Sequence, residues 1–138
     1  MAPIDEKDSG MERINALTES VIGAALEVHR ELGPGLLEGV YEKALCRELT
    51  LRHIPFEQQV QVPLSYKGES LETHLRLDLV IDKKLILDLK AVDRLLPIHE
   101  AQLLTYLKLS HLPVGLLLNF YETRLKDGLK RLARTRSS

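Results

Sequence analysis

Residues 75–90 read LRLDLVIDKKLILDLK, and this stretch decides the fold. Leucine or isoleucine stands at every second position on both sides of the central Asp-Lys-Lys, which is the period of a β-strand with one buried face. The three polar residues 82–84 interrupt the pattern and predict a short loop. We therefore predict two antiparallel strands, residues 75–81 and 85–90, joined as a hairpin.

The leucine pattern also predicts the register of this hairpin. With a three-residue loop, Ile81 faces Leu85 and all the leucines share one face. The same register sets Asp78 directly across from Asp88 on the opposite face. A two-residue loop would instead oppose Asp78 to Leu87 and mix both faces. Because neighbouring carboxylates repel, we expect a cation between them, and a divalent ion with oxygen ligands is the natural candidate.

The polar face of the hairpin also sets Arg76 across from Lys90. The simpler interpretation of this face is that its charged side chains are only solvated, as on most amphipathic strands. Val80 and Ile86 lie on the same face, however, and predict that part of it is covered. A partly covered face with two opposed aspartates and a lysine favours a functional site.

Helical and strand patterns continue outward from the hairpin on both sides. We predict helices over residues 15–32, 37–53 and 97–111, strands over 58–64 and 114–118, and an amphipathic helix from residue 123. The order α-α-β-β-β-α-β-α predicts an α/β fold with a mixed central sheet flanked by helices. We expect a single domain over residues 13–133, with disordered tails at residues 1–12 and 134–138.

Length and composition narrow the class of protein. A chain of 138 residues suits one domain, and its net charge of −1 argues against a broad basic surface while leaving room for a local basic groove. The single cysteine, Cys46, cannot form an internal disulfide. No apolar run approaches the roughly 20 residues of a membrane span, and the first ten residues are polar. We expect a cytoplasmic protein without a membrane partner.

The predicted helix over residues 97–111 has a polar face of its own. Gln102 and Tyr106 are four residues apart and share this face, and His99 stands three residues before Gln102. The simplest interpretation is that all three point to solvent. A helix that follows a strand packs beside it, however, so this helix could aim Gln102 and Tyr106 at the two aspartates.

These residues together resemble the signature of the PD-(D/E)XK nuclease superfamily. Asp78 followed by Asp88-Leu89-Lys90 is similar to Asp…(Asp/Glu)-X-Lys, although Glu is the commoner residue at the position of Asp88. Residues 102–106 resemble the Gln-X-X-X-Tyr motif of the RecB-like and lambda-exonuclease-like branches. Residues 35–41, GLLEGVY, resemble the pattern that names the GxxExxY proteins. The resemblance covers residues 15–131 and implies a restriction-endonuclease-like core.

The resemblance implies a divalent-metal-dependent nuclease that hydrolyses phosphodiester bonds of nucleic acid, with DNA favoured over RNA. It implies Mg²⁺ or Mn²⁺ as the cofactor. The implied metal ligands are Asp78, Asp88, the backbone carbonyl of Leu89, and Glu38 directly or through water. The implied catalytic residues are Asp78, Asp88, Lys90, Glu38, Gln102 and Tyr106, with Lys90 orienting the attacking water.

Alternatives remain open at the level of the sequence. The chain is also compatible with a catalytically silent binding or assembly module, or with a metal-dependent hydrolase of small nucleotides. Glu38 could simply favour the start of its helix, and Tyr41 is more typical of a core residue. His99 is either a partner of the site or a surface residue. A homodimer fits the small size of the domain, but no particular residue indicates one.

Overall fold

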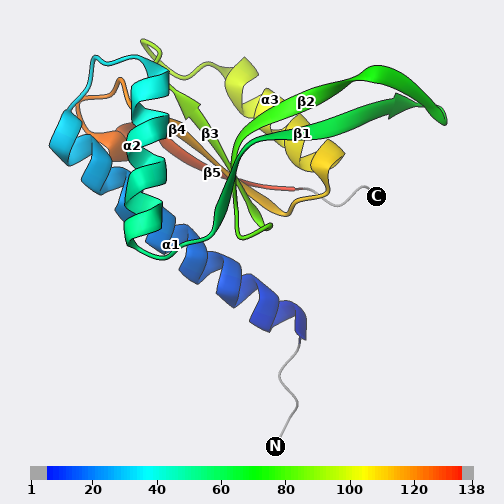
Figure 1. The fold of residues 1–138 in the computed structure, drawn as a ribbon, viewed down its shortest axis with the longest axis horizontal. Helices are drawn as coiled ribbons and strands as arrows, with labels where there is room; N and C mark the ends of the chain where they lie inside the picture. Colours follow the sequence, from blue (N-terminus) through cyan, green and yellow to red (C-terminus); the bar gives the residue numbers. More distant parts are fainter. Residues whose placement is uncertain (1–5, 135–138) are drawn as a thin grey trace, which may run out of the picture.

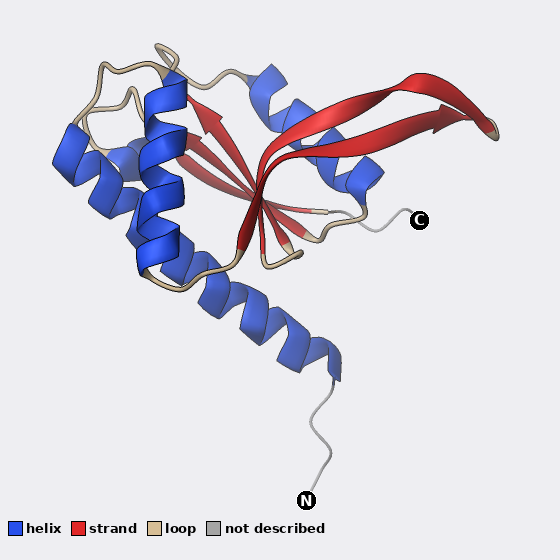
Figure 2. Cartoon of the chain, viewed as in Figure 1, coloured by secondary structure: helices blue, strands red, loops and turns tan. Residues whose placement is uncertain are grey.

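A computed structural model describes residues 6–134 of the chain, and Figures 1 and 2 show a sheet with helices on both faces. The elements in chain order are α1 (Glu6–Leu32), α2 (Glu38–Leu51), β1 (Phe56–Tyr66), β2 (Glu69–Ile81), β3 (Leu85–Lys90), α3 (Pro97–Ser110), β4 (Val114–Asn119), the 3₁₀ helix η1 (Leu125–Gly128) and β5 (Leu129–Ala133). This arrangement confirms the predicted α/β class with a mixed sheet flanked by helices.

The five strands lie in the sheet in the order β1-β2-β3-β4-β5. All neighbouring strands are antiparallel except β3 and β4, which are parallel and are connected through α3. A parallel pair needs such a crossover, because the chain must return to the end of the sheet at which the first strand began. In this crossover a loop over residues 91–96 leads from Lys90 to α3, and the helix packs beside the polar face of the hairpin.

Two apolar cores hold the layers together. The larger core packs α1 and α2 against the leucine face of the sheet, which includes Leu79, Leu87 and Leu116. The smaller core packs α3 against the opposite face, where Val80 and Ile86 are buried. The prediction that the polar face is partly covered is therefore confirmed, because α3 is its cover.

The hairpin register is confirmed over three residue pairs, Leu79–Leu87, Val80–Ile86 and Ile81–Leu85. The loop has the expected three residues, and the N–H of Lys84 donates to the carbonyl of Ile81 at 2.9 Å. The ladder ends at Leu79–Leu87, one position before Asp78 and Asp88, and these two aspartates line one pocket. The two aspartates lie where β2 and β3 begin to separate.

The separation arises because β1 and β2 turn away from the sheet. Gln59, which lies between the paired residues Gln58 and Val60 of β1, has a φ of 51°, a backbone angle that is uncommon in a strand. Beyond this point the two strands project as a ribbon past α3 (Figure 2). Leu77 consequently joins the smaller core, beside Leu103 of α3, and not the leucine face that its alternation predicted.

The predicted helix from residue 123 is wrong. Only the short helix η1 forms, and residues 129–133 pair antiparallel with β4 as β5. Gly128 is the residue before β5. It lies so close to the carbonyl oxygen of Asn119 that an added Cβ would be 2.8 Å from that oxygen. This strand forms hydrogen bonds with the backbone N–H and C=O groups along the free edge of β4. That pairing favours a strand over the helix that the spacing of Leu129 and Leu132 predicted.

The N-terminal boundary also differs from the expectation. Helix α1 begins at Glu6, so residues 6–12, which were expected to belong to a disordered tail, are helical. Residues 1–5 and 135–138 of the expected tails lie outside the described residues. Among the described residues, no helix is long and apolar enough to cross a membrane.

Candidate active site

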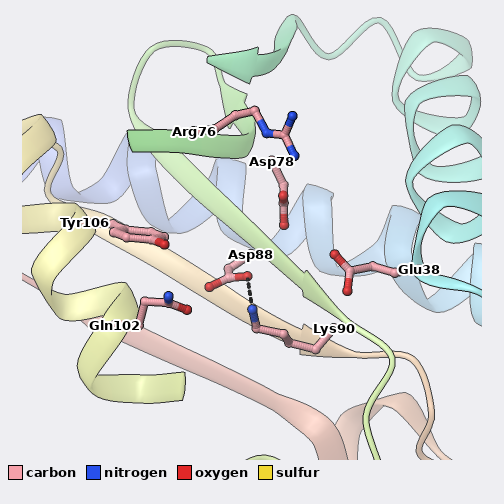
Figure 3. Close-up of a pocket in the computed structure, with 7 residues that line it drawn as sticks. All are labelled: Glu38, Arg76, Asp78, Asp88, Lys90, Gln102 and Tyr106. Carbon is pink, nitrogen blue, oxygen red and sulfur yellow. Dashed lines mark ion pairs between the residues drawn. The ribbon is translucent and has the colours of Figure 1, made fainter. Parts of the chain in front are cut away.

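One pocket collects side chains from four elements of the fold. It has a volume of about 120 Å³, and Figure 3 shows its lining: Glu38 from α2, Arg76 and Asp78 from β2, Asp88 and Lys90 from β3, and Gln102 and Tyr106 from α3. All six side chains that the sequence singled out as catalytic lie in this lining. Arg76 is the additional member.

Asp88 is the most buried charged residue of the pocket, with 5% of its surface exposed. Its Oδ1 lies 3.3 Å from the Nζ of Lys90, and its Oδ2 has no hydrogen-bond partner among the described residues. Burial raises the pKa of Asp88, and the positive charge of Lys90 and its hydrogen bond oppose this rise. The ionised form of Asp88 therefore lacks part of the stabilisation that water would give it.

Asp78 joins the two strands at the point where their ladder ends. Its Oδ2 accepts a hydrogen bond from the backbone N–H of Leu89 at 2.9 Å. Burial is the main cause that raises the pKa of Asp78, and the negative charge of Asp88 adds to it, while the Leu89 N–H lowers it. The two aspartates thus interact electrostatically although their backbones are not paired.

Glu38 stands in the first turn of α2, and its position depends on Tyr41. The Tyr41 hydroxyl donates to the carbonyl of Gly33 and accepts from the N–H of Leu36 at 3.1 Å, which fixes the loop before α2. The ring is fully buried and stacks on Phe120, so the prediction of a core residue is confirmed. Partial burial and the charge of Asp78 raise the pKa of Glu38.

Gln102 and Tyr106 reach the pocket because α3 packs closely on β4. Leu103 and Leu107 are fully buried on the adjoining side of the same helix, and Tyr106 packs against the core that they form. Gly115 allows this approach, since a Cβ at that position would lie 2.9 Å from Cδ1 of Leu103. The helix therefore presents Gln102 and Tyr106 to the pocket, and Tyr106 contacts the smaller core as well.

A sequence model described as the PD-(D/E)XK nuclease superfamily matches residues 15–132. The chain belongs to the PD-(D/E)XK nuclease superfamily. The superfamily predicted from Asp78, Asp88 and Lys90 is thereby confirmed, whereas the closer resemblance to GxxExxY proteins stays a prediction. Comparisons with curated proteins and with solved structures found no match.

Asn119 is a buried polar residue beside the PD-(D/E)XK pocket that the sequence analysis did not single out for a role. It lies at the end of β4, paired in register with Lys90. Its Oδ1 accepts from the N–H of Val92 at 3.0 Å, and its Nδ2 donates to the carbonyl of Val92 at 2.9 Å. Asn119 thereby fixes the backbone of the loop that follows Lys90. In the sequence, the only sign of this role is that an asparagine ends a buried apolar strand.

His99 lies at the start of α3 and is not part of the pocket lining. Its Nδ1 accepts a hydrogen bond from the N–H of Leu96 at 2.9 Å, which caps the start of α3. It also lies close enough to Asp88 to lower the pKa of that residue. The observed role of His99 is that of a helix cap, and a role as a partner of the site stays a prediction.

The donor set of the pocket suits a hard divalent cation, which carboxylate and carbonyl oxygens bind. The unsatisfied Oδ2 of Asp88 is a buried acceptor that a cation or water would satisfy. Among the described residues, however, no three Asp, Glu, His or Cys side chains are gathered closely enough to form a metal-ligand cluster. The fit therefore rests on Asp78 and Asp88, and Glu38 would contribute through water or after a movement.

Proposed function

We propose that this protein is a divalent-metal-dependent nuclease that hydrolyses phosphodiester bonds. One observation carries the proposal: Asp78, Asp88 and Lys90 share a pocket in a chain of the PD-(D/E)XK superfamily. Solvated strand residues would not account for the burial of Asp88 or for the raised pKa values of both aspartates. Acidic groups whose pKa is raised by burial in a pocket are candidates for catalytic residues.

Mg²⁺ or Mn²⁺ would be held by Asp78, Asp88 and the backbone carbonyl of Leu89, with Glu38 completing the ligands. When bound, such an ion lowers the pKa of a coordinated water and stabilises charge on phosphoryl oxygens. The carboxylates must be ionised to bind it, which their raised pKa values oppose in the free protein. A bound cation would lower the pKa of both carboxyl groups, because it favours their charged forms.

Lys90 would act on the substrate from a fixed position. Its ammonium group is held by Oδ1 of Asp88, and 20% of its side chain is exposed, so it can still reach a water or phosphate in the pocket. A preorganised cation stabilises the negative charge that develops during phosphoryl transfer. Gln102 and Tyr106 would orient the attacking water, Lys90 or a phosphate oxygen through their polar ends.

The pocket is better suited to one phosphate of a strand than to a whole nucleotide. Its volume of about 120 Å³ falls well below the ~300–1,000 Å³ of sites that enclose small molecules. This size argues against a hydrolase of free nucleotides, while the complete acidic and lysine set argues against a silent module. Our proposal includes DNA in preference to RNA and a cytoplasmic location, and a homodimer stays a prediction.

Replacement of Lys90 tests the proposal. Purified protein is incubated with single-stranded DNA, duplex DNA and RNA in Mg²⁺ or Mn²⁺, and product strands are quantified. We expect Lys90→Ala to lower cleavage by about 100- to 1,000-fold, the cost of losing one preorganised stabilising group. The matched control is Lys43→Ala, which removes an exposed lysine of α2 that does not line the pocket.

Two results would contradict the nuclease assignment. One is wild-type protein that cleaves none of these substrates with either metal. The other is Lys90→Ala protein that cleaves as fast as the wild type while it retains the wild-type melting temperature.

A further inference from the structure

The pocket lining contains two cationic side chains, Lys90 and Arg76, and they differ in whether a carboxylate pairs with them. Lys90 is already within ion-pair distance of Asp88. The side chain of Arg76 forms no ion pair or hydrogen bond with any other residue of the described chain, although it lines the same pocket. Figure 3 shows both Arg76 and Asp78 extending from β2, two residues apart on one face of the strand.

The charge of Arg76 is not explained by the carboxylates near it. The pKa of Asp88 is lowered by Lys90 and His99, and that of Glu38 by Lys90. Arg76 is not among the groups that lower the pKa of any carboxylate in the pocket. An exposed guanidinium that neutralises no neighbour, at the edge of a polar pocket, keeps its hydrogen-bond donors available for an external anion.

We propose that Arg76 binds a phosphate of the substrate strand at this pocket, and so acts as a substrate-binding residue. The inference rests on the proposed function, which it deepens by naming the substrate group that Arg76 recognises. A guanidinium presents paired N–H donors that match two oxygens of a phosphate. A phosphate diester has the required charge, and the pocket is large enough to admit such a group while bases and sugars stay outside.

Electrostatics support an anion-binding role for Arg76 in the metal-loaded site. The lining carries the carboxylates of Glu38, Asp78 and Asp88 against the cations of Arg76 and Lys90. A bound divalent ion would shift this balance to a net positive charge, and removal of Arg76 would cancel that excess. The rest of the chain offers little compensation, because its overall net charge is −1.

The experiment measures binding separately from cleavage. Fluorescently labelled single-stranded DNA, duplex DNA and RNA are titrated with protein in Ca²⁺, with anisotropy as the readout and a gel to verify intact strands. We expect Arg76→Ala to weaken binding of the preferred strand by roughly 10- to 100-fold, as for loss of a charge-assisted contact. Arg76→Lys should be intermediate, because it keeps the charge but loses the paired donors.

The salt dependence of binding supplies a second readout that a purely structural role would not change. Loss of one phosphate contact should reduce the slope of log affinity against log salt by about 0.7–0.9. The control is Arg13→Ala, which makes the same change in net charge on the exposed surface of α1. We expect its affinity and slope to equal those of the wild type.

Three outcomes would overturn the role of Arg76. These are wild-type protein that binds no strand, Arg76→Ala protein with unchanged affinity and slope, and an Arg13→Ala effect as large as that of Arg76→Ala. Melting curves of each variant exclude unfolding as the cause of lost binding. If Arg76→Ala weakens binding but Lys90→Ala still cleaves normally, the proposed catalysis fails while the assignment of Arg76 stands.

Discussion

Asp88 is a single side chain that lowers the stability of the folded state and also lines the candidate active site. Its carboxylate is buried beside one ammonium group, and one oxygen is left without a hydrogen bond among the described residues. A raised pKa means that the native state disfavours the ionised form more than the unfolded state does. The ionisation of Asp88 therefore lowers the stability of the metal-free protein at neutral pH.

Replacement of Asp88 by the neutral, nearly isosteric asparagine should relieve this cost. We expect metal-free Asp88→Asn protein to be more stable than the wild type at pH 7 by on the order of 1 kcal/mol, because the amide has no charge to be desolvated. The wild type loses stability as pH rises from the ordinary value of 3.8 through the raised native pKa, so the difference should shrink in acid.

Urea denaturation of both proteins in EDTA, at a series of pH values, measures this difference. Glu19→Gln, which neutralises an exposed carboxylate of α1, is the control and should change stability little. A less stable Asp88→Asn protein at pH 7 would show instead that the Lys90 pairing outweighs the desolvation of Asp88.

Among the elements, α3 has the most influence on the pocket, because it carries Gln102 and Tyr106 while its leucines fill the smaller core, against which Tyr106 also packs. Its distance from β4 is set by the absence of a side chain at Gly115. We expect Gly115→Ala to destabilise the protein by about 1–3 kcal/mol, since the new methyl would contact fully buried Leu103. Cleavage should fall too, as α3 is displaced.

Thermal unfolding and strand cleavage check this prediction together. Gly39→Ala in α2 is the matched control, because an added Cβ there meets nothing within 4 Å. That change should stabilise the protein by about 0.5–1 kcal/mol through its lower cost of helix formation. A Gly115→Ala protein as stable and active as the wild type would mean that Leu103 repacks freely.

At the scale of the whole molecule, the residues that line the pocket come from layers that pack in two separate cores. Its lining comes from α2 on one face of the sheet, from α3 on the other, and from β2 and β3 between them. A ligand that bridges these elements binds the native state and not the unfolded chain, so it stabilises the entire fold.

Divalent metal should accordingly raise the melting temperature of the protein. A concentration of one hundred times Kd contributes about 2.7 kcal/mol of stability. The gain should increase with pH, because Asp78 and Asp88 must lose their protons to bind the ion. Calorimetric melting with and without Mg²⁺ or Mn²⁺ measures it. An equal gain in a protein carrying both Asp78→Asn and Asp88→Asn would place the ion elsewhere.

Much of this molecule could be predicted from local patterns. The alternation of leucines determined the hairpin, its three-residue loop and its register over residues 79–81 and 85–87. The same alternation put Asp88 and Lys90 on one face, and the spacing of Gln102 and Tyr106 put them together on α3. These features depend on strand and helix periods, which neighbouring residues define by themselves.

Only the tertiary structure decided the rest. Residues 129–133 became a strand because β4 offered an unpaired edge, and Leu77 changed cores because the ribbon turns near Gln59. The burial of Asp88, the anchoring role of Asn119 and the unpaired state of Arg76 among the described residues likewise depend on elements distant in sequence. Such features arise from contacts between elements, and the periodicity of one segment contains no information about its eventual neighbours.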